Sequence, residues 1–144
     1  MQIKNIDFNP EEHEQYKALS VKNPYATLIA EGKKKIEVRN KKTKFRGTVL
    51  ICSSQFPIVE SLESGCTLAF VEIYDCKKVS ELTDDEWELT KINASRDKFK
   101  DQFAWLMRNP EKVIEFPVKG QLGIYSLTYT KGNIMKYPKN NFNL

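Results

Sequence analysis

Three side chains that could do chemistry together, Lys34, Glu37 and Arg39, lie within six consecutive residues. Charged and apolar residues alternate from 35 to 39, which predicts a strand with Glu37 and Arg39 on one face, about 7 Å apart. A guanidinium can grip a phosphate through two N–H groups, and a carboxylate can accept from the exocyclic amine of a base. Lys34 precedes the strand, in a short connection from which its side chain can reach over the same face as Glu37 and Arg39. These residues predict a site for a ligand that carries a phosphate and a base.

The same spacing also fits a structural alternative. Glu37 and Arg39 could form a surface ion pair on a solvated edge strand, worth ~0–1 kcal/mol. Two further residues carry a similar choice. Tyr25 could stack a base at a cleft wall, but its spacing from Leu28 and Ile29 favours packing in the core. Ser53, at the end of an apolar run, could donate a hydrogen bond into the cleft or serve a turn.

The positive charge of the chain is concentrated around these residues. Between Lys33 and Arg46 there are eight basic residues and one acidic residue. The other 130 positions hold 15 basic and 18 acidic residues, so the net charge of +4 comes from this one window. A near-neutral protein with one basic patch presents that patch to an anionic partner.

The cations of this window outside the predicted site form a candidate phosphate-tracking surface, with a solubilising loop as the alternative. They are Lys33, Lys35, Lys41, Lys42, Lys44 and Arg46, of which Arg46 is also a candidate ligand-binding residue.

Composition excludes several other classes of site. With His13 as the single histidine, a zinc site of Cys/His type and a histidine-based triad are disfavoured. The three cysteines are odd in number, form no CxxC pair and lie in or beside apolar runs, which favours buried thiols. We expect no metal and no cofactor. No apolar run approaches the ~20 residues of a membrane span, and the first 17 residues lack a signal-peptide core, so we expect a cytoplasmic protein without membrane contact.

The pattern of elements predicts an α+β fold with a curled, mostly antiparallel sheet or small barrel. Asn23 and Pro24 favour a helix start, and Gly32 favours its end. Thr83 and Glu86 match a capping box. The expected strands are 19–21, 35–39, 48–52, 66–76, 113–118 and 122–130, and a further helix capped by Ser95 is expected to carry Phe99, Phe103 and Leu106 and to end before Pro110. We divide the chain into an N-terminal arm (1–17), one domain (18–130) and a C-terminal tail (131–144).

Taken together, several segments resemble the ASCH domain (activating signal cointegrator homology), a branch of the PUA-like superfamily. Gly32, Lys34, Glu37 and Arg39 are similar to the family's G-x-K-x-x-E-x-R signature. The resemblance covers roughly residues 18–128 and rests on segments 19–26, 32–39, 46–53, 64–76 and 109–125. It implies a six-stranded β-barrel with flanking helices, and a cleft lined by the signature residues. It also implies that Lys119, at a turn that the family places near this cleft, contacts phosphate.

The resemblance implies RNA or a modified nucleotide as the ligand, with DNA as a possibility, because members of the ASCH family bind such ligands. Some members are hydrolases, so the resemblance leaves both functions open. Acetylcytidine amidohydrolases of this kind use a Lys, a Thr where this chain has Glu37, and a distal Glu. This chain keeps Lys34 but lacks the Thr, and Glu86, Glu88 and Asp97 are candidates for the distal acid. For a ribonuclease, Glu37 could act as base on a 2′-hydroxyl and Lys34 could stabilise the phosphate. A third possibility is an interaction module that docks on an acidic protein surface.

Overall fold

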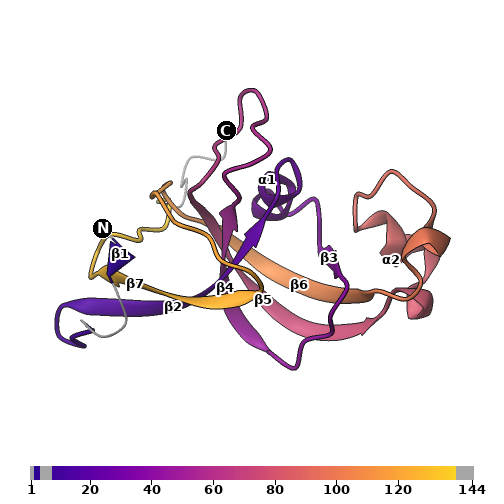
Figure 1. Ribbon diagram of the computed structural model, residues 1–144, viewed down its shortest axis with the longest axis horizontal. Coiled ribbons are helices and arrows are strands. Elements are labelled where there is room, and N and C mark those ends of the chain that lie inside the picture. The colour runs from indigo at the N-terminus through magenta and orange to yellow at the C-terminus, as the bar shows by residue number, and fades with distance from the viewer. Residues whose placement is uncertain (1, 4–7, 139–144) are drawn as a thin grey trace.

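The computed structural model describes residues 2–3 and 8–138, and it contains one mixed sheet that curves into a half-barrel (Figure 1). The strand order is β1-β7-β2-β4-β5-β6-β3. The predicted α+β, PUA-like fold with six strands is confirmed, and a two-residue strand is added at one edge. The strands are β1 (Gln2–Ile3), β2 (His13–Val21), β3 (Ile36–Arg39), β4 (Gly47–Ser53), β5 (Thr67–Lys78), β6 (Phe103–Lys112) and β7 (Ile124–Thr130).

Strand pairing places the predicted site at one edge of the sheet. β2 and β4 are parallel neighbours, and the other pairs are antiparallel. β3 pairs only with β6 in the described part of the chain, where Glu37 stands opposite Trp105 and Arg39 opposite Phe103. The side of β3 that faces away from β6 is therefore open to the helical segments and loops around it.

Helix α1 (Tyr25–Ala30) packs on one face of the sheet (Figure 1). Its buried residues Ala26, Ile29 and Ala30 join side chains of β2, β4, β5 and β6 in the largest hydrophobic cluster. A second cluster covers the other side of β2, β4 and β7 with residues from segment 113–118. A third lies beneath β3 and β6, where the 3₁₀ turn η2 (Val79–Glu81), helix α2 (Asp84–Glu88) and the 3₁₀ turn η3 (Arg96–Phe99) fold over the end of the sheet.

The predicted long helix after Ser95 is wrong. Ser95 does cap, because its hydroxyl accepts from the Asp97 amide, but only the short turn η3 follows. Phe103 and Leu106 belong to strand β6 instead. The first half of this strand is buried on both faces, with Trp105 and Met107 in the largest cluster and Ala104 and Leu106 in the third, whereas residues 108–112 are exposed. A strand covered on both sides is a continuous apolar run, in which a helical spacing arises by chance.

The predicted strand 113–118 is also wrong. Only isolated bridges occur there, one joining Cys66 with Pro117 and one joining Val113 with Lys136. The second bridge ties Lys136 of the predicted C-terminal tail to the domain. Residues 139–144 of this tail are outside the described part. Strand β2 begins at His13, inside the predicted arm, and pairs along β7 from there. The division at residue 17 therefore falls in the middle of a strand, and arm residues 1 and 4–7 are outside the described part.

Local signals at the helix ends are confirmed, except that α1 begins one residue later than predicted, with Pro24 and not Asn23 at the N-cap position. Thr83 and Glu86 form the predicted capping box at α2. Gly32 follows α1 with φ +77°, as expected of a glycine after a helix C-cap. Cys52 and Cys66 are buried free thiols, and burial raises the pKa of Cys52 to about 12. Within the described residues, no helix has the length and apolar character to cross a membrane.

Candidate functional site

The end of α1 sets the position of Lys34. The Gly32 amide donates to the carbonyl of Ile29 and the Lys33 amide to that of Leu28, which is the Schellman pattern of a helix terminus. The Lys34 amide also donates to Leu28, at 3.0 Å. These bonds reverse the chain after the short helix, and the main chain then enters β3. Lys34 is thus held between two fixed elements.

Lys34 points inward, contrary to the expectation that it reaches over an open mouth. Its side chain is 1% exposed, and Nζ donates to the carbonyl of Thr90 at 2.6 Å. The Tyr25 ring centroid lies 4.9 Å from Nζ. Burial lowers the pKa of the Lys34 ammonium from its ordinary value, and the charge of Glu37 opposes part of this shift.

Glu37 joins the two cations of the site. Its Oε1 lies 3.5 Å from Lys34 Nζ, and its Oε2 accepts from Nε of Arg39 at 3.0 Å and lies 3.0 Å from Nη2. Glu37 and Arg39 share one face of β3, as predicted. The surface ion pair of the structural alternative does not describe this group, because the Glu37 side chain is only 10% exposed.

Arg39 spans from β3 to β2. Its Nη2 also donates to the carbonyl of Ser20 at 2.8 Å, and its guanidinium lies 5.8 Å from the centroid of the Trp105 ring. No partner for Nη1 occurs among the described residues, so this nitrogen keeps both N–H groups for a ligand. The guanidinium is therefore held in place on one side and available on the other.

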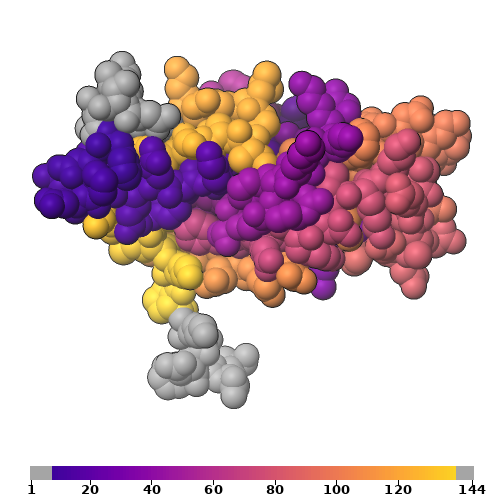
Figure 2. Space-filling model, turned by 90° about the horizontal axis from the view of Figure 1, so that it is seen from below, coloured from indigo at the N-terminus to yellow at the C-terminus, as the bar shows by residue number. Residues whose placement is uncertain are grey.

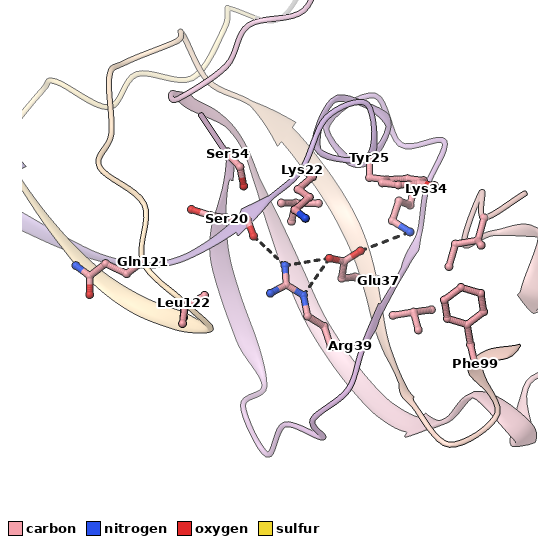
Figure 3. Close-up of a pocket in the computed structure, with 13 residues that line it drawn as sticks. Ser20, Lys22, Tyr25, Lys34, Glu37, Arg39, Ser54, Phe99, Gln121 and Leu122 are labelled. Carbon is pink, nitrogen blue, oxygen red and sulfur yellow. Dashed lines mark hydrogen bonds and ion pairs between the residues drawn. The ribbon is translucent and has the colours of Figure 1, made fainter. Parts of the chain in front are cut away.

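A cleft of about 420 Å³ opens over Lys34, Glu37 and Arg39 (Figure 3). Tyr25 of α1 and Phe99 of η3 border one end of the cleft. Leu122 and Gln121 lie at the opposite end, across Arg39. Ile92 and Val38 add apolar wall, and Ser20, Lys22 and Ser54 add polar groups. The volume falls in the range of small-ligand pockets. Apolar walls with a few fixed polar groups are also typical of such pockets.

The structure brings together Tyr25, Lys34, Glu37 and Arg39 among the predicted site residues. Three others lie outside the cleft. Ser53 is buried and its hydroxyl contacts Cys66, so the neighbouring Ser54 lines the cleft instead. Lys119 is exposed and precedes Gln121 of the cleft rim by two residues. Arg46 lines a separate groove. Ligand roles for Ser53, Lys119 and Arg46 stay predictions.

The predicted phosphate-tracking cations divide over several surfaces. Lys33 pairs with Glu31 at 3.3 Å, and Lys35 lines a hollow beside Met107 on the far side of Lys34. Lys41, Lys42 and Lys44 are carried by the loop that follows β3. The first two line a hollow next to the cleft, and Lys42 and Lys44 line the groove that contains Arg46.

Sequence reasoning missed the residues that complete the cleft from distant segments: Ser20, Lys22, Ser54, Thr90, Ile92, Phe99, Gln121 and Leu122. Ser20 and Lys22 lie in a segment that carries the family resemblance, so a signal for them was present. Leu122 had a different signal, since an apolar side chain that is 98% exposed is unusual, but exposure cannot be read from a sequence. Thr90 acts through its backbone carbonyl and had no residue-type signal.

The cleft offers cations, one carboxylate and apolar walls, but no metal site. In the described part of the chain, no three His, Cys, Asp or Glu residues are placed to hold an ion. The candidate distal acids Glu86, Glu88 and Asp97 do not line the cleft, and Glu86 is engaged with Lys77 and with the cap of α2. Glu37 is therefore the one carboxylate among the lining residues, and both of its oxygens face cations.

Two sets of known proteins are similar to this chain. Activating signal cointegrator 1 of Homo sapiens is 26% identical over 134 residues, and its Mus musculus counterpart is 25% identical. Each match covers 76% of this chain, which spans only 22% of the length of those proteins. A crystal structure of ASCH from Zymomonas mobilis matches with a TM-score of 0.54 at 16% identity, covering 70% of this chain and 72% of that one.

A serine-to-alanine mutant of the Zymomonas mobilis protein matches in the same way, with a TM-score of 0.53 at 16% identity, covering 71% of this chain and 73% of that one. At such identity these structures support the fold alone. The model of the ASCH domain matches residues 19–118, which include both β3 and most of the cleft. This chain belongs to the ASCH domain family.

Proposed function

We propose that this protein binds RNA or a nucleotide-like ligand in the cleft over Lys34, Glu37 and Arg39. The observation that carries the proposal is the Arg39 guanidinium, which Glu37 and Ser20 fix in place while Nη1 keeps its donors for a ligand. Held in this way, the guanidinium can donate from Nη1 to phosphate oxygens at little cost in side-chain entropy.

The walls suit a base. The Tyr25 and Phe99 rings border the cleft, and aromatic faces stack bases of any sequence. Lys22, which is exposed at the mouth, adds a second cation beside Arg39. Glu37 is committed to two cations and has lone pairs left to accept from an exocyclic amine. The expectation from the family resemblance, an RNA or modified nucleotide, agrees with this arrangement.

Calorimetry with nucleoside monophosphates tests the proposal. We expect saturable binding that falls at least tenfold in Arg39→Gln. The matched control is Arg108→Gln, because Arg108 also pairs with a glutamate, Glu72, but does not line the cleft. Binding that is equally strong in both variants, or no binding of any nucleotide or oligonucleotide at millimolar ligand, would contradict the proposal.

A second candidate function is hydrolysis, and the buried amine of Lys34 is the observation that favours it. A neutral lysine has two N–H groups, which match the acceptors at Thr90 and Glu37, and its lone pair remains for a substrate proton. Burial lowers the pKa of Lys34, which favours this neutral form. Incubation with N4-acetylcytidine, or with a short RNA, tests for product. Turnover that survives Lys34→Met would exclude Lys34 as the base.

A further inference from the structure

A chain of adjoining hollows continues from the cleft toward the basic loop of residues 40–46. The cleft shares Arg39 and Leu122 with a hollow of about 510 Å³ between this loop and residues 122–124. That hollow shares Lys42 and Thr43 with a groove of about 480 Å³, which the loop forms with the end of β5. The three spaces therefore form one path along the surface.

The groove at the far end is strongly basic, and part of its charge comes from outside the 33–46 window. Lys77 and Lys78 at the end of β5 line it together with Lys42, Lys44 and Arg46, against the single acid Glu81. Figure 2 shows the segment around residues 40–50 (purple) beside the one that follows β5 (pink). Two distant segments thus supply five cations to one groove.

Most of these cations are not neutralised by the protein. Lys77 pairs with Glu86 at 2.9 Å, and Arg46 approaches Asp75 only to 3.9 Å. Lys42, Lys44 and Lys78 have no ion pair within residues 8–138. A solubilising surface gains nothing from gathering unpaired cations in a groove, where they repel one another. Their arrangement fits an anionic chain with regularly spaced charges.

The loop that presents these lysines has a fixed backbone although it is neither helix nor strand. Trp105 Nε1 donates to the carbonyl of Lys41 at 2.9 Å, and Phe45 packs against the largest hydrophobic cluster. Arg46 donates to the carbonyls of Thr43 and Phe45. A partner that binds here does not have to order the loop, which removes part of the entropic cost of binding.

The surface between cleft and groove also offers apolar contact. Leu122 is 98% exposed, lines both the cleft and the adjoining hollow, and has Ile124 beside it in that hollow. An exposed leucine between two cationic regions suits the face of an unstacked base. An acidic protein surface would bring carboxylates to this place rather than an apolar ring.

We propose that the ligand of this protein is a single-stranded nucleic acid several nucleotides long. One base enters the cleft, and the phosphates that follow pass over residues 40–43 into the groove lined by Lys42, Lys44, Lys77 and Lys78. This inference rests on the proposed function of the cleft and extends it from one nucleotide to a chain. A duplex does not fit this path, because its bases are stacked and paired and cannot enter a cleft.

Fluorescence anisotropy with labelled single strands of one to eight nucleotides tests the path. We expect affinity to rise over the first several nucleotides and to fall at least tenfold in the variant Lys42→Gln/Lys44→Gln/Lys78→Gln. The salt dependence of log affinity should flatten by about 2 in this variant, at ~0.7 per lost phosphate contact on a single strand. The control Lys100→Gln/Lys112→Gln/Lys131→Gln removes the same charge from exposed lysines outside the three hollows, and we expect a change below threefold.

Calorimetry with a mononucleotide separates this inference from the proposed function. If Arg39→Gln abolishes mononucleotide binding while chain length and the groove variant have no effect, the cleft proposal holds and the path is wrong. If Arg39→Gln leaves every ligand bound, the cleft proposal is wrong and the path fails with it. Equal affinity for a duplex, or for polyglutamate, would also overturn the path. RNA and DNA strands of one sequence identify the preferred sugar.

Discussion

Two groups of cations in this protein are alike in the sign of their charge, but one group is enclosed by the protein and the other is exposed. In the cleft, Lys34 is 1% exposed, and it and Arg39 are both bound to Glu37. In the groove, Lys42, Lys44 and Lys78 are exposed and have no ion pair among the described residues. The first group lies next to the aromatic and apolar walls, and the second lies on a loop and at a strand end.

The difference separates two tasks that one basic window in the sequence combines. A cation fixed by its neighbours recognises geometry, because its donors point in directions that the protein has set. An exposed lysine supplies charge at long range, which salt screens and which another cation can replace. We therefore expect the effect of a cleft substitution on ligand affinity to depend on the shape of the new side chain. In the groove, we expect the effect on affinity to depend on charge alone.

The largest effect is expected from Glu37→Gln, which removes the one carboxylate between two cations. Lys34 and Arg39 would then repel each other with little solvent to screen them, and we expect the free energy of unfolding to fall by about 2–3 kcal/mol. Urea denaturation at neutral pH measures this. The comparison variant is Glu72→Gln, whose partner Arg108 is exposed, and its effect should be clearly smaller. Equal losses in the two variants would mean that burial of the cleft group has no energetic consequence.

Arg39→Lys tests whether the shape of the cation matters. Lysine keeps the charge but cannot bind Glu37 and Ser20 together while it presents two further donors, so we expect nucleotide affinity to fall about tenfold. In the groove, Lys44→Arg is the corresponding exchange, and we expect oligonucleotide affinity to change less than twofold. Calorimetry on both variants gives the contrast. A similar loss in each, or none in either, would remove the distinction between the two groups.

A smaller effect is expected from Gly120→Ala, which would crowd Ser20 of β2, the residue whose carbonyl accepts from Arg39. A Cβ at this position would lie 2.7 Å from Ser20 Oγ, which is itself bonded to the Tyr125 hydroxyl at 2.7 Å. We expect the free energy of unfolding to fall by about 1 kcal/mol, the value of one hydrogen bond. Thermal or urea unfolding measures the change.

The control for this prediction is the same substitution in a Ser20→Ala background. Without Oγ, the nearest Ser20 atom to the new Cβ is the Cβ at 3.4 Å, so Gly120→Ala should cost much less there. An undiminished cost in the double variant would show that the strain comes from the turn itself and not from contact with β2.

The fold was largely predictable because local signals and the order of apolar runs were consistent. The helix start near Pro24, the glycine after it, the capping box at Thr83 and five of the six long strands follow from residue types and spacing. The sixth, β6, was predicted as a helix. Its first half is buried on both faces and its second half is exposed, so the alternation that marks a half-buried strand is absent from its sequence.

The candidate site was predictable only where its residues share one element. Glu37 and Arg39 are two apart on β3, so their pairing follows from the strand period. The inward direction of Lys34 depends on a carbonyl at Thr90, 56 residues away, which no spacing rule connects with it. The groove likewise needs Lys77 and Lys78 from β5, and only the folded sheet places them beside the 40–46 loop.

The smallest effect is expected in the pH dependence of stability that Lys34 contributes. Burial lowers its folded-state pKa below the ordinary 10.5 of the unfolded chain, so between these two values the unfolded chain binds more protons. Stability from this group therefore rises with pH through that window and levels off above 10.5. The tyrosines at 16, 125 and 129, whose pKa values are raised, act in the opposite direction, so the wild type alone is not informative.

The useful quantity is the difference in unfolding free energy between wild type and Lys34→Met, followed by urea denaturation from pH 7 to 10.5. This difference should move in favour of the wild type as the pH rises, by a modest amount because Glu37 offsets part of the burial. A constant difference would mean that burial does not lower the pKa of Lys34, and a difference that falls with pH would mean that the protein stabilises Lys34 as a cation. Either result would remove the support for Lys34 as the base in the hydrolytic alternative.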